Sequence, residues 1–272
     1  INESTHLAKN TQIAYARQYK NLRTLLKHDI YNTSPAILIS TIQTAPLTIS
    51  ARQALINIAY IIKSKDLSIN LDKLIDYRIN INQSANKHAK EKNQKLNLSL
   101  PDYDKLVDYT DELYNSNEWI YYIINYLILY YNVRNLDLVF EIVNLKRETV
   151  DTNKNYLWVT NKKVVFIRNI YKTAKVYNQK VNVITDIKFI TAMKRIRDLQ
   201  KLDLESGIII KNINQLGYYI QKATYNNLGE GNYLKIVLNH YRNDFNMIKE
   251  ISKNRGTSID TLAEFYDLKS IV

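Results

Sequence analysis

The chain of 272 residues contains no cysteine, and it has only five glycines and three prolines. Without cysteine there is neither a disulfide framework nor thiolate chemistry. The scarcity of glycine and proline favours long helices joined by few tight turns. Neither GxxxxGK[ST] nor GxGxxG occurs, so neither common phosphate-binding loop is expected. The histidines have no metal-ligand spacing, and we expect neither a metal site nor a cofactor; they are His6, His28, His88 and His240.

The sequence also lacks an apolar run long enough to cross a membrane. Its longest run, Trp119–Tyr131, is about a third shorter than a spanning helix and contains Asn125. This run is expected to form a buried helix. The first ten residues lack the basic segment and apolar run of a signal peptide. We therefore expect no membrane partner and an intracellular location, in a host nucleus or cytoplasm or in a nucleoid.

Basic residues are in clear excess. Thirty-eight Lys and Arg against 26 Asp and Glu give a net charge of +12, and 46% of the residues are hydrophobic, which is enough for a real core. An excess of this size indicates a nucleic-acid partner first and an acidic membrane surface second. The abundance of Ile, Asn, Lys and Tyr suggests AT-rich coding DNA, as in a virus or mobile element.

Four helix-start signals occur in the first part of the chain. Asn10-Thr11, Ser34-Pro35 and Thr48-Ile49-Ser50 can each cap a helix, and Asn70 precedes a fourth apolar period. They predict a compact helical module over residues 1–84, which we interpret as a DNA-binding domain.

A polar, basic stretch follows at residues 82–95. Because it has no apolar period, it fits a linker, which we place at 85–98, and it fits a solvated helix extension equally well. Its lysines can follow a DNA backbone; they are Lys87, Lys90, Lys92 and Lys95.

Residues 99–272 form the second predicted domain, where the pattern changes to β in the middle. The segments 156–160, 164–167 and 180–184 are expected to be strands, the first two forming a hairpin, with helices before and after them. The predicted fold class is therefore mainly α with a small three-stranded antiparallel sheet (α+β). We expect the two domains to form a clamp around duplex DNA.

Basic and phenolic residues recur at intervals along this second domain. Arg134 precedes Asn-Leu-Asp-Leu, and Lys172 lies between the second and third predicted strands. Arg242 ends the sequence Asn-His-Tyr-Arg, and Tyr266 follows it by 24 positions, after the element Arg-Gly-Thr-Ser at 255–258. Guanidinium groups bind phosphate oxygens through two parallel hydrogen bonds, and a lysine can protonate a leaving oxygen. These residues suit transfer of a phosphoryl group onto a tyrosine.

In the order and spacing of these motifs, the chain resembles the tyrosine recombinase (phage integrase) family over nearly its whole length. The resemblance implies a fold with an N-terminal core-binding module, and DNA cleavage and rejoining through a 3′-phosphotyrosyl intermediate without metal or ATP. Tyr266 would be the nucleophile, Arg134 and Arg242 the phosphate clamp, and Lys172 the general acid. Lys175 and Arg255 would contact DNA. The partners would be duplex DNA and, on it, three further protomers, the free protein being a monomer.

Two positions depart from the family pattern. Asn239 stands where a histidine is usual, with His240 one place later, and Thr257 stands where His or Trp is usual. Because these groups orient the phosphate in the family, their replacement is expected to slow the reaction. His240 fits a displaced histidine and a helix-surface residue equally well.

Two other functions stay open at this point. One is a type IB topoisomerase, which relaxes DNA through the same chemistry with one protomer. The other is a DNA-binding protein that has kept the fold and lost catalysis. Tyr266 is also one of 22 tyrosines, and Lys162, Lys163 and Lys175 compete with Lys172 for the role of general acid.

Overall fold

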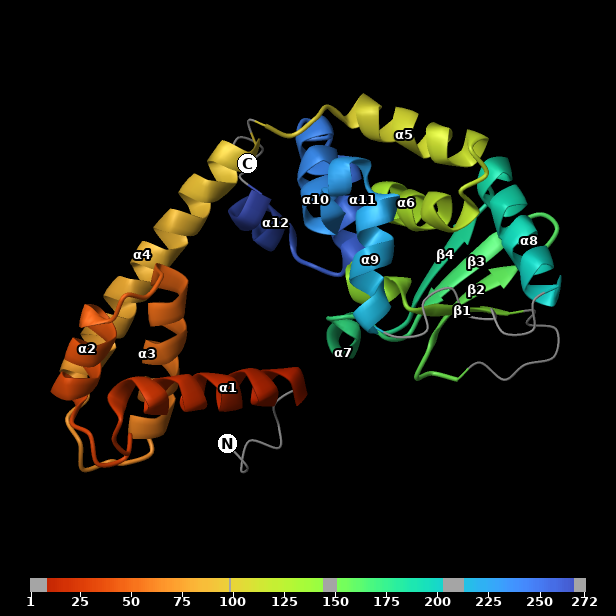
Figure 1. Ribbon diagram of the computed structural model, residues 1–272. Helices are drawn as coiled ribbons and strands as arrows, with labels where there is room; N and C mark the ends of the chain where they lie inside the picture. The colour runs from red at the N-terminus through yellow and green to blue at the C-terminus, as the bar shows by residue number, and fades with distance from the viewer. Residues whose placement is uncertain (1–8, 98, 144–150, 203–212, 267–272) are drawn as a thin grey trace. The chain divides into compact units, whose positions relative to one another are not determined.

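The computed structural model describes residues 9–97, 99–143, 151–202 and 213–266. The chain divides into two compact units, at 1–95 and 96–272. Each unit has a hydrophobic core of its own, and each is described here by itself (Figure 1).

Four helices form the first unit: α1 (Lys9–Leu26), α2 (Pro35–Thr44), α3 (Ile49–Lys63) and α4 (Asp72–Asn97). Two begin at predicted caps. The Ser34 hydroxyl accepts a hydrogen bond from the Ile37 amide, and the Thr48 hydroxyl accepts one from the Ala51 amide. Aliphatic side chains from all four helices fill the core between them; fully buried examples are Leu22, Leu38, Ile42, Ile56 and Leu74.

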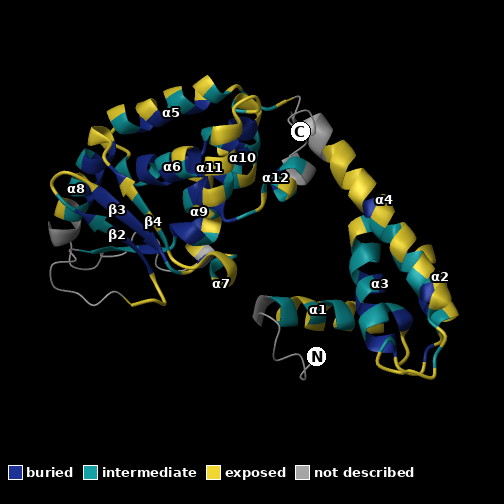
Figure 2. Cartoon of the chain, turned by 180° about the vertical axis from the view of Figure 1, so that it is seen from behind, coloured by how far each residue is buried: buried dark blue, intermediate teal, exposed yellow. Residues whose placement is uncertain are grey.

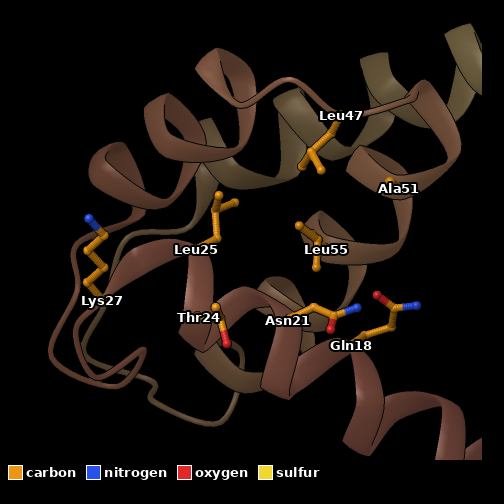
Figure 3. A pocket seen from close by; sticks show the side chains of 8 residues that line it. All are labelled: Gln18, Asn21, Thr24, Leu25, Lys27, Leu47, Ala51 and Leu55. Atoms are coloured by element: carbon orange, nitrogen blue, oxygen red, sulfur yellow. The ribbon is translucent and has the colours of Figure 1, made fainter.

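A hollow of about 470 Å³ opens between α1 and α3 in this unit (Figure 3). Leu25, Leu47 and Leu55 supply its apolar lining, while Gln18 and Asn21 supply amide groups. Neither acids nor histidines line it among the residues that the structure describes, so we assign no chemistry to it.

The polar stretch at 82–95 is helical and forms the C-terminal part of α4, so the helix extension is the arrangement observed. This part of α4 is mostly exposed (Figure 2). The side chains of Lys87, Lys90 and Lys92 lie in solvent, and Lys95 is near the end of the helix. Among the described side chains, Ala85 is the buried residue of this part of α4.

The second unit places helices around one small sheet. Before and within the sheet region lie α5 (Tyr103–Asn115), α6 (Trp119–Tyr131), a 3-10 turn η1 (Asn135–Leu138) and the short α7 (Ala174–Tyr177). After it come α8 (Ile187–Leu202), α9 (Ile213–Ala223), η2 (Tyr225–Asn227), α10 (Gly229–His240), α11 (Phe245–Arg255) and α12 (Ile259–Tyr266).

The sheet corrects the sequence prediction. It has four strands in the order β1-β2-β3-β4: β1 (Phe140–Val143), β2 (Asn155–Val159), β3 (Val164–Arg168) and β4 (Lys180–Ile184). The three predicted strands are present and pair antiparallel, but β1 is an additional strand that runs parallel to β2. Eleven residues separate β1 from β2 in the sequence. Strand β1 has only four residues and begins two positions after η1 ends. The sequence therefore shows no strand signal there that can be separated from the arginine motif.

Helix α6 lies at the centre of this unit, as its composition predicts. Seven of its thirteen residues are buried (Figure 2), and the apolar ones belong to one core cluster with residues of the sheet and of the surrounding helices. Asn125 is completely buried and fully used: its amide donates to the Ala223 carbonyl and the Tyr233 hydroxyl, and it accepts from the Thr110 hydroxyl at 2.7 Å. Among the described helices none has the length and apolar character that a bilayer span requires.

Candidate active site

Arg134 stands at the junction of α6 and η1. Helix α6 ends at Asn132 in the left-handed conformation (φ 50°), and Val133 is completely buried. Arg134 is then extended, and its carbonyl accepts the Asp137 amide at 2.9 Å, which closes η1. Both sides of Arg134 are therefore fixed by backbone structure, and its half-buried side chain leaves the core in a defined direction.

A chain of hydrogen bonds joins Arg134 to two distant segments. Arg134 Nη1 lies 3.4 Å from the Thr173 hydroxyl, which in turn donates to the Gly256 carbonyl at 2.7 Å. Thr173 follows Lys172 between β3 and α7, and Gly256 follows α11. Three of the motifs recognised in the sequence, around Arg134, Lys172 and Gly256, therefore meet at one place.

Gly256 is the point of closest packing in this cluster. It ends α11 in the left-handed conformation (φ +64°), which glycine adopts without strain. A Cβ atom here would lie 2.6 Å from Lys180 Nζ and 2.8 Å from Thr173 Oγ1. Both conformation and space thus require glycine, and its small size allows the end of α11 to approach β4.

Behind these residues lies a buried ionic network. Arg168, at the end of β3, donates from Nη1 to the Asp137 carboxylate at 3.0 Å and to the Asn254 carbonyl at 2.9 Å, and from Nη2 to Asn182 at 2.8 Å. Burial raises the pKa of Asp137 and lowers the pKa of Arg168, and each partner opposes the shift of the other. The network ties η1, the sheet and α11 together close to Arg134.

Lys180, the first residue of β4, is a cation that the family motifs do not include. Its Nζ donates to the carbonyls of Lys253 (2.5 Å) and Asn254 (3.2 Å) and lies 4.9 Å from the centre of the Tyr171 ring. Burial, and secondarily the positive charge of Arg168, lowers the pKa of Lys180 to about 8. The sequence gives only one weak indication of a role for Lys180, namely its place at the start of an alternating strand. Nothing in the sequence relates Lys180 to Gly256.

Arg255 is used inside the protein. It is 7% exposed, forms an ion pair with Glu230 at the start of α10, and donates to the Asn132 carbonyl at 3.3 Å. This differs from the expected DNA contact, because a buried, paired guanidinium is not available to a phosphate. Its position holds the end of α6 and the start of α10 against the end of α11.

Arg242 lies at the opposite end of α10 from Glu230. It is exposed in the turn after the helix, and His240 nearby stacks on Tyr103 with ring centres 4.2 Å apart. At 1.5 Å per residue, the twelve positions from Glu230 to Arg242 correspond to about 18 Å along the helix. Asn239 is exposed near the same end. The hydrogen bonds that join Arg134, Thr173 and Gly256 do not include these residues.

Another cation of α10 lies nearer the first turn of the helix. Lys235 is half-buried on the same helix, only five residues after Glu230, which is about 7.5 Å along the axis. Burial lowers the pKa of Lys235. After Lys180, Lys235 is the second cation that the family motifs do not include. For this segment those motifs point to Arg242 instead.

Helix α12 follows the Gly256 turn directly. Thr257 is half-buried, and its carbonyl accepts the Ser252 hydroxyl at 2.6 Å. The Ser258 hydroxyl caps the helix by accepting the Thr261 amide at 3.1 Å, and Leu262 is completely buried in the core. Tyr266 is the last residue of α12, one turn beyond Leu262.

Lys172 and Lys175 both lie in the segment between β3 and β4, and both are exposed. Lys172 is adjacent in sequence to Thr173, and its catalytic role stays a prediction. Lys175 belongs to α7. Across the described part of the chain, no group of three or more His, Asp or Glu side chains is placed to hold a metal ion.

Comparison with known proteins adds little to this geometry. No model of a known protein family matches the chain, and no curated protein sequence matches it. Among solved structures, the chain is similar to the crystal structure of XerA recombinase, with 12% sequence identity and a TM-score of 0.40, over 96% of this chain and 88% of that one. A likeness at that level carries no functional argument, which must come from the site itself.

Proposed function

We propose that the protein cleaves and rejoins DNA strands through a tyrosine, as a site-specific recombinase. One observation carries the proposal: the hydrogen-bonded chain from Arg134 through Thr173 to Gly256. It brings together a guanidinium, the segment of Lys172 and the turn that leads to Tyr266. Arg134 and Thr173 are 39 residues apart in the sequence, and Thr173 and Gly256 are 83 residues apart. The net charge of +12 supports DNA as the partner.

The chemistry follows from the residue types. The Tyr266 phenol gives up its proton to water and its oxygen attacks the phosphorus of a phosphodiester. The bond from phosphorus to the 5′ oxygen breaks, and Lys172 protonates that oxygen. Arg134 neutralises the charge that builds up on the nonbridging oxygens in the transition state. The protein then holds the 3′ end as a phosphotyrosine ester, whose retained bond energy permits rejoining.

Strand exchange also sets requirements on assembly. Two duplexes contribute four strands, so a complete exchange uses four active sites, and we propose a tetramer on DNA formed from free monomers. The exposed lysines of α4 would track the DNA backbone, the two units closing on the duplex as a clamp. The protein would act wherever its host keeps that DNA, inside the cell.

The decisive experiment is a search for the covalent adduct. A nicked suicide substrate traps a protein–DNA ester because the cleaved fragment diffuses away. Tyr266→Phe removes only the phenolic oxygen, so this variant is expected to bind DNA with unchanged affinity and to give no adduct. Tyr218→Phe is a matched control on the exposed surface of α9, and it should give the wild-type yield.

Two results would change the proposal. An adduct with Tyr266→Phe identifies another tyrosine as the nucleophile. No adduct with the wild-type protein, together with tight DNA binding, favours a DNA-binding protein without catalysis, for which the exposed position of Arg242 and the departures at Asn239 and Thr257 give specific grounds.

A further inference from the structure

Two cations stand opposite each other where β3 pairs with β4. Arg168 and Lys180 are direct cross-strand partners. Like charges in this arrangement normally repel each other and destabilise a sheet. Here both side chains donate to the same acceptor, the Asn254 carbonyl, at 2.9 Å from Arg168 and 3.2 Å from Lys180. The buried carboxylate of Asp137, paired with Arg168, offsets part of this repulsion, and the shared acceptor points to a role at the end of α11.

The acceptor is the end of a helix. The last carbonyls of an α-helix have no partner within it and carry partial negative charge, which cations stabilise. In α11 these include Lys253 and Asn254, and Lys180 donates to both. Two residues after Asn254 comes Gly256, whose carbonyl reaches Thr173 and, through it, Arg134.

We infer that Lys180 is a positioning residue: together with Arg168, its ammonium holds the end of α11 so that the Gly256–Thr257 turn stays against Thr173 and Arg134. The consequence for cleavage rests on the proposed function, whereas the effect on the turn does not. The space that a Cβ at Gly256 would need is the space that Lys180 Nζ and Thr173 Oγ1 occupy.

The electrostatic surroundings agree with a positioning role. Burial and the charges of Arg168 and Arg134 lower the pKa of Lys180 to about 8, and only Asp137 opposes them. The charged form of Lys180 is therefore held in an environment that disfavours it. Polar groups kept under such conditions are common at functional sites.

The first measurement is amide hydrogen exchange over residues 252–258, in which the Gly256 and Thr257 amides both donate to the Ser252 carbonyl. In Lys180→Met these amides should exchange about tenfold faster, because the turn opens more often. Lys180→Gln, which keeps one donor group, should fall between Met and wild type, and Lys180→Arg should stay near wild type. Lys188→Met, which removes a surface lysine paired with Asp111, should change nothing in this peptide.

The second measurement is the single-turnover rate of cleavage of a nicked substrate at saturating DNA. Lys180→Met should lower it about 100-fold, as misplaced catalytic groups do, with unchanged DNA affinity and with recovery in Lys180→Arg. A simple stabilising residue would not separate rate from affinity in this way.

Two outcomes overturn the inference: wild-type exchange in Lys180→Met, and faster exchange combined with a wild-type cleavage rate. If the wild-type protein itself does not cleave, the proposed function fails, and the exchange result alone decides whether Lys180 positions the turn.

Discussion

Lys172 and Lys180 are eight residues apart, on either side of α7, and their ammonium groups have different surroundings. Lys172 is exposed beside Thr173, while Lys180 is half-buried and its ammonium contacts carbonyls of α11 and the Tyr171 ring. An exposed ammonium can approach a bound DNA strand, whereas one that already donates to two carbonyls cannot do so without releasing them. We therefore assign the proton donor to Lys172 and the positioning role to Lys180.

This assignment predicts different responses to a better leaving group. Lys172→Ala should cleave ordinary DNA very slowly and recover on a 5′-bridging phosphorothiolate, because departing sulfur needs no proton. Lys180→Met should not recover, since a displaced turn slows attack on either substrate. The measurement is the single-turnover cleavage rate of each variant on ordinary DNA and on the 5′-bridging phosphorothiolate. Equal impairment of a folded Lys172→Ala on both would assign the proton to another group.

At the scale of single elements, α10 carries two candidates, Lys235 and Arg242, for a second phosphate-binding cation in the proposed reaction. Its first turn is held at the cluster by Glu230 and Arg255, and its last turn is held against α5 by the stacking of His240 on Tyr103. Lys235 lies closer to the first turn along the helix than Arg242 does.

We expect Lys235→Met to reduce the cleavage rate by at least about tenfold, and Arg242→Met to reduce it less. Single-turnover cleavage of a nicked substrate by the two variants, prepared side by side, gives the order. The reverse order would mean that the end of α10 moves to the site when DNA binds.

Helix α6 gives a prediction about stability. Replacing Asn125 by Ala leaves the Ala223 carbonyl, the Thr110 hydroxyl and the Tyr233 hydroxyl without their shared partner inside the core. Leaving buried polar groups unsatisfied costs about 1–3 kcal/mol. Urea unfolding of the second unit should show this decrease in the free energy of unfolding, while Asn115→Ala, at the exposed end of α5, should stay within about 0.5 kcal/mol of wild type.

These elements also show what the sequence can and cannot predict. The caps at Ser34 and Thr48, the buried α6 and the three antiparallel strands follow from local patterns of polarity and turn residues, and the structure has them. Strand β1 escapes prediction because its pairing depends on β2, which lies beyond a long connection.

The same limit applies to the site. The motifs around Arg134, Lys172 and Gly256 are visible locally, and they do meet in the structure. The importance of Lys180 and the internal role of Arg255 depend on contacts over 73 and 123 residues of sequence, which no local pattern encodes. An arginine near a glycine looks the same in sequence whether it faces DNA or, as here, Glu230.

For the whole molecule, the charge predicts how DNA binding responds to salt. Each phosphate that a lysine neutralises releases counterions, so affinity should fall steeply as salt rises, linearly on logarithmic axes. Replacing the exposed Lys87, Lys90 and Lys92 of α4 by Gln should reduce the slope by about one for each phosphate that is no longer neutralised.

Fluorescence anisotropy with labelled duplex at several salt concentrations measures both slopes. An affinity independent of salt would contradict the role of net charge. An unchanged slope in the triple variant would place the DNA elsewhere than on α4.

The long sequence separations within the site have a consequence for when activity can first arise. The hydrogen-bonded pairs Thr173–Gly256, Arg168–Asn254 and Arg255–Asn132 are separated in the sequence by 83, 86 and 123 residues. Contacts of this range form only as the second unit completes its folding. A nascent or proteolytically shortened chain that lacks α11 can therefore carry Arg134 and Lys172 without an assembled site. Under the proposed function, the chain would therefore cleave no DNA until its last helices have docked.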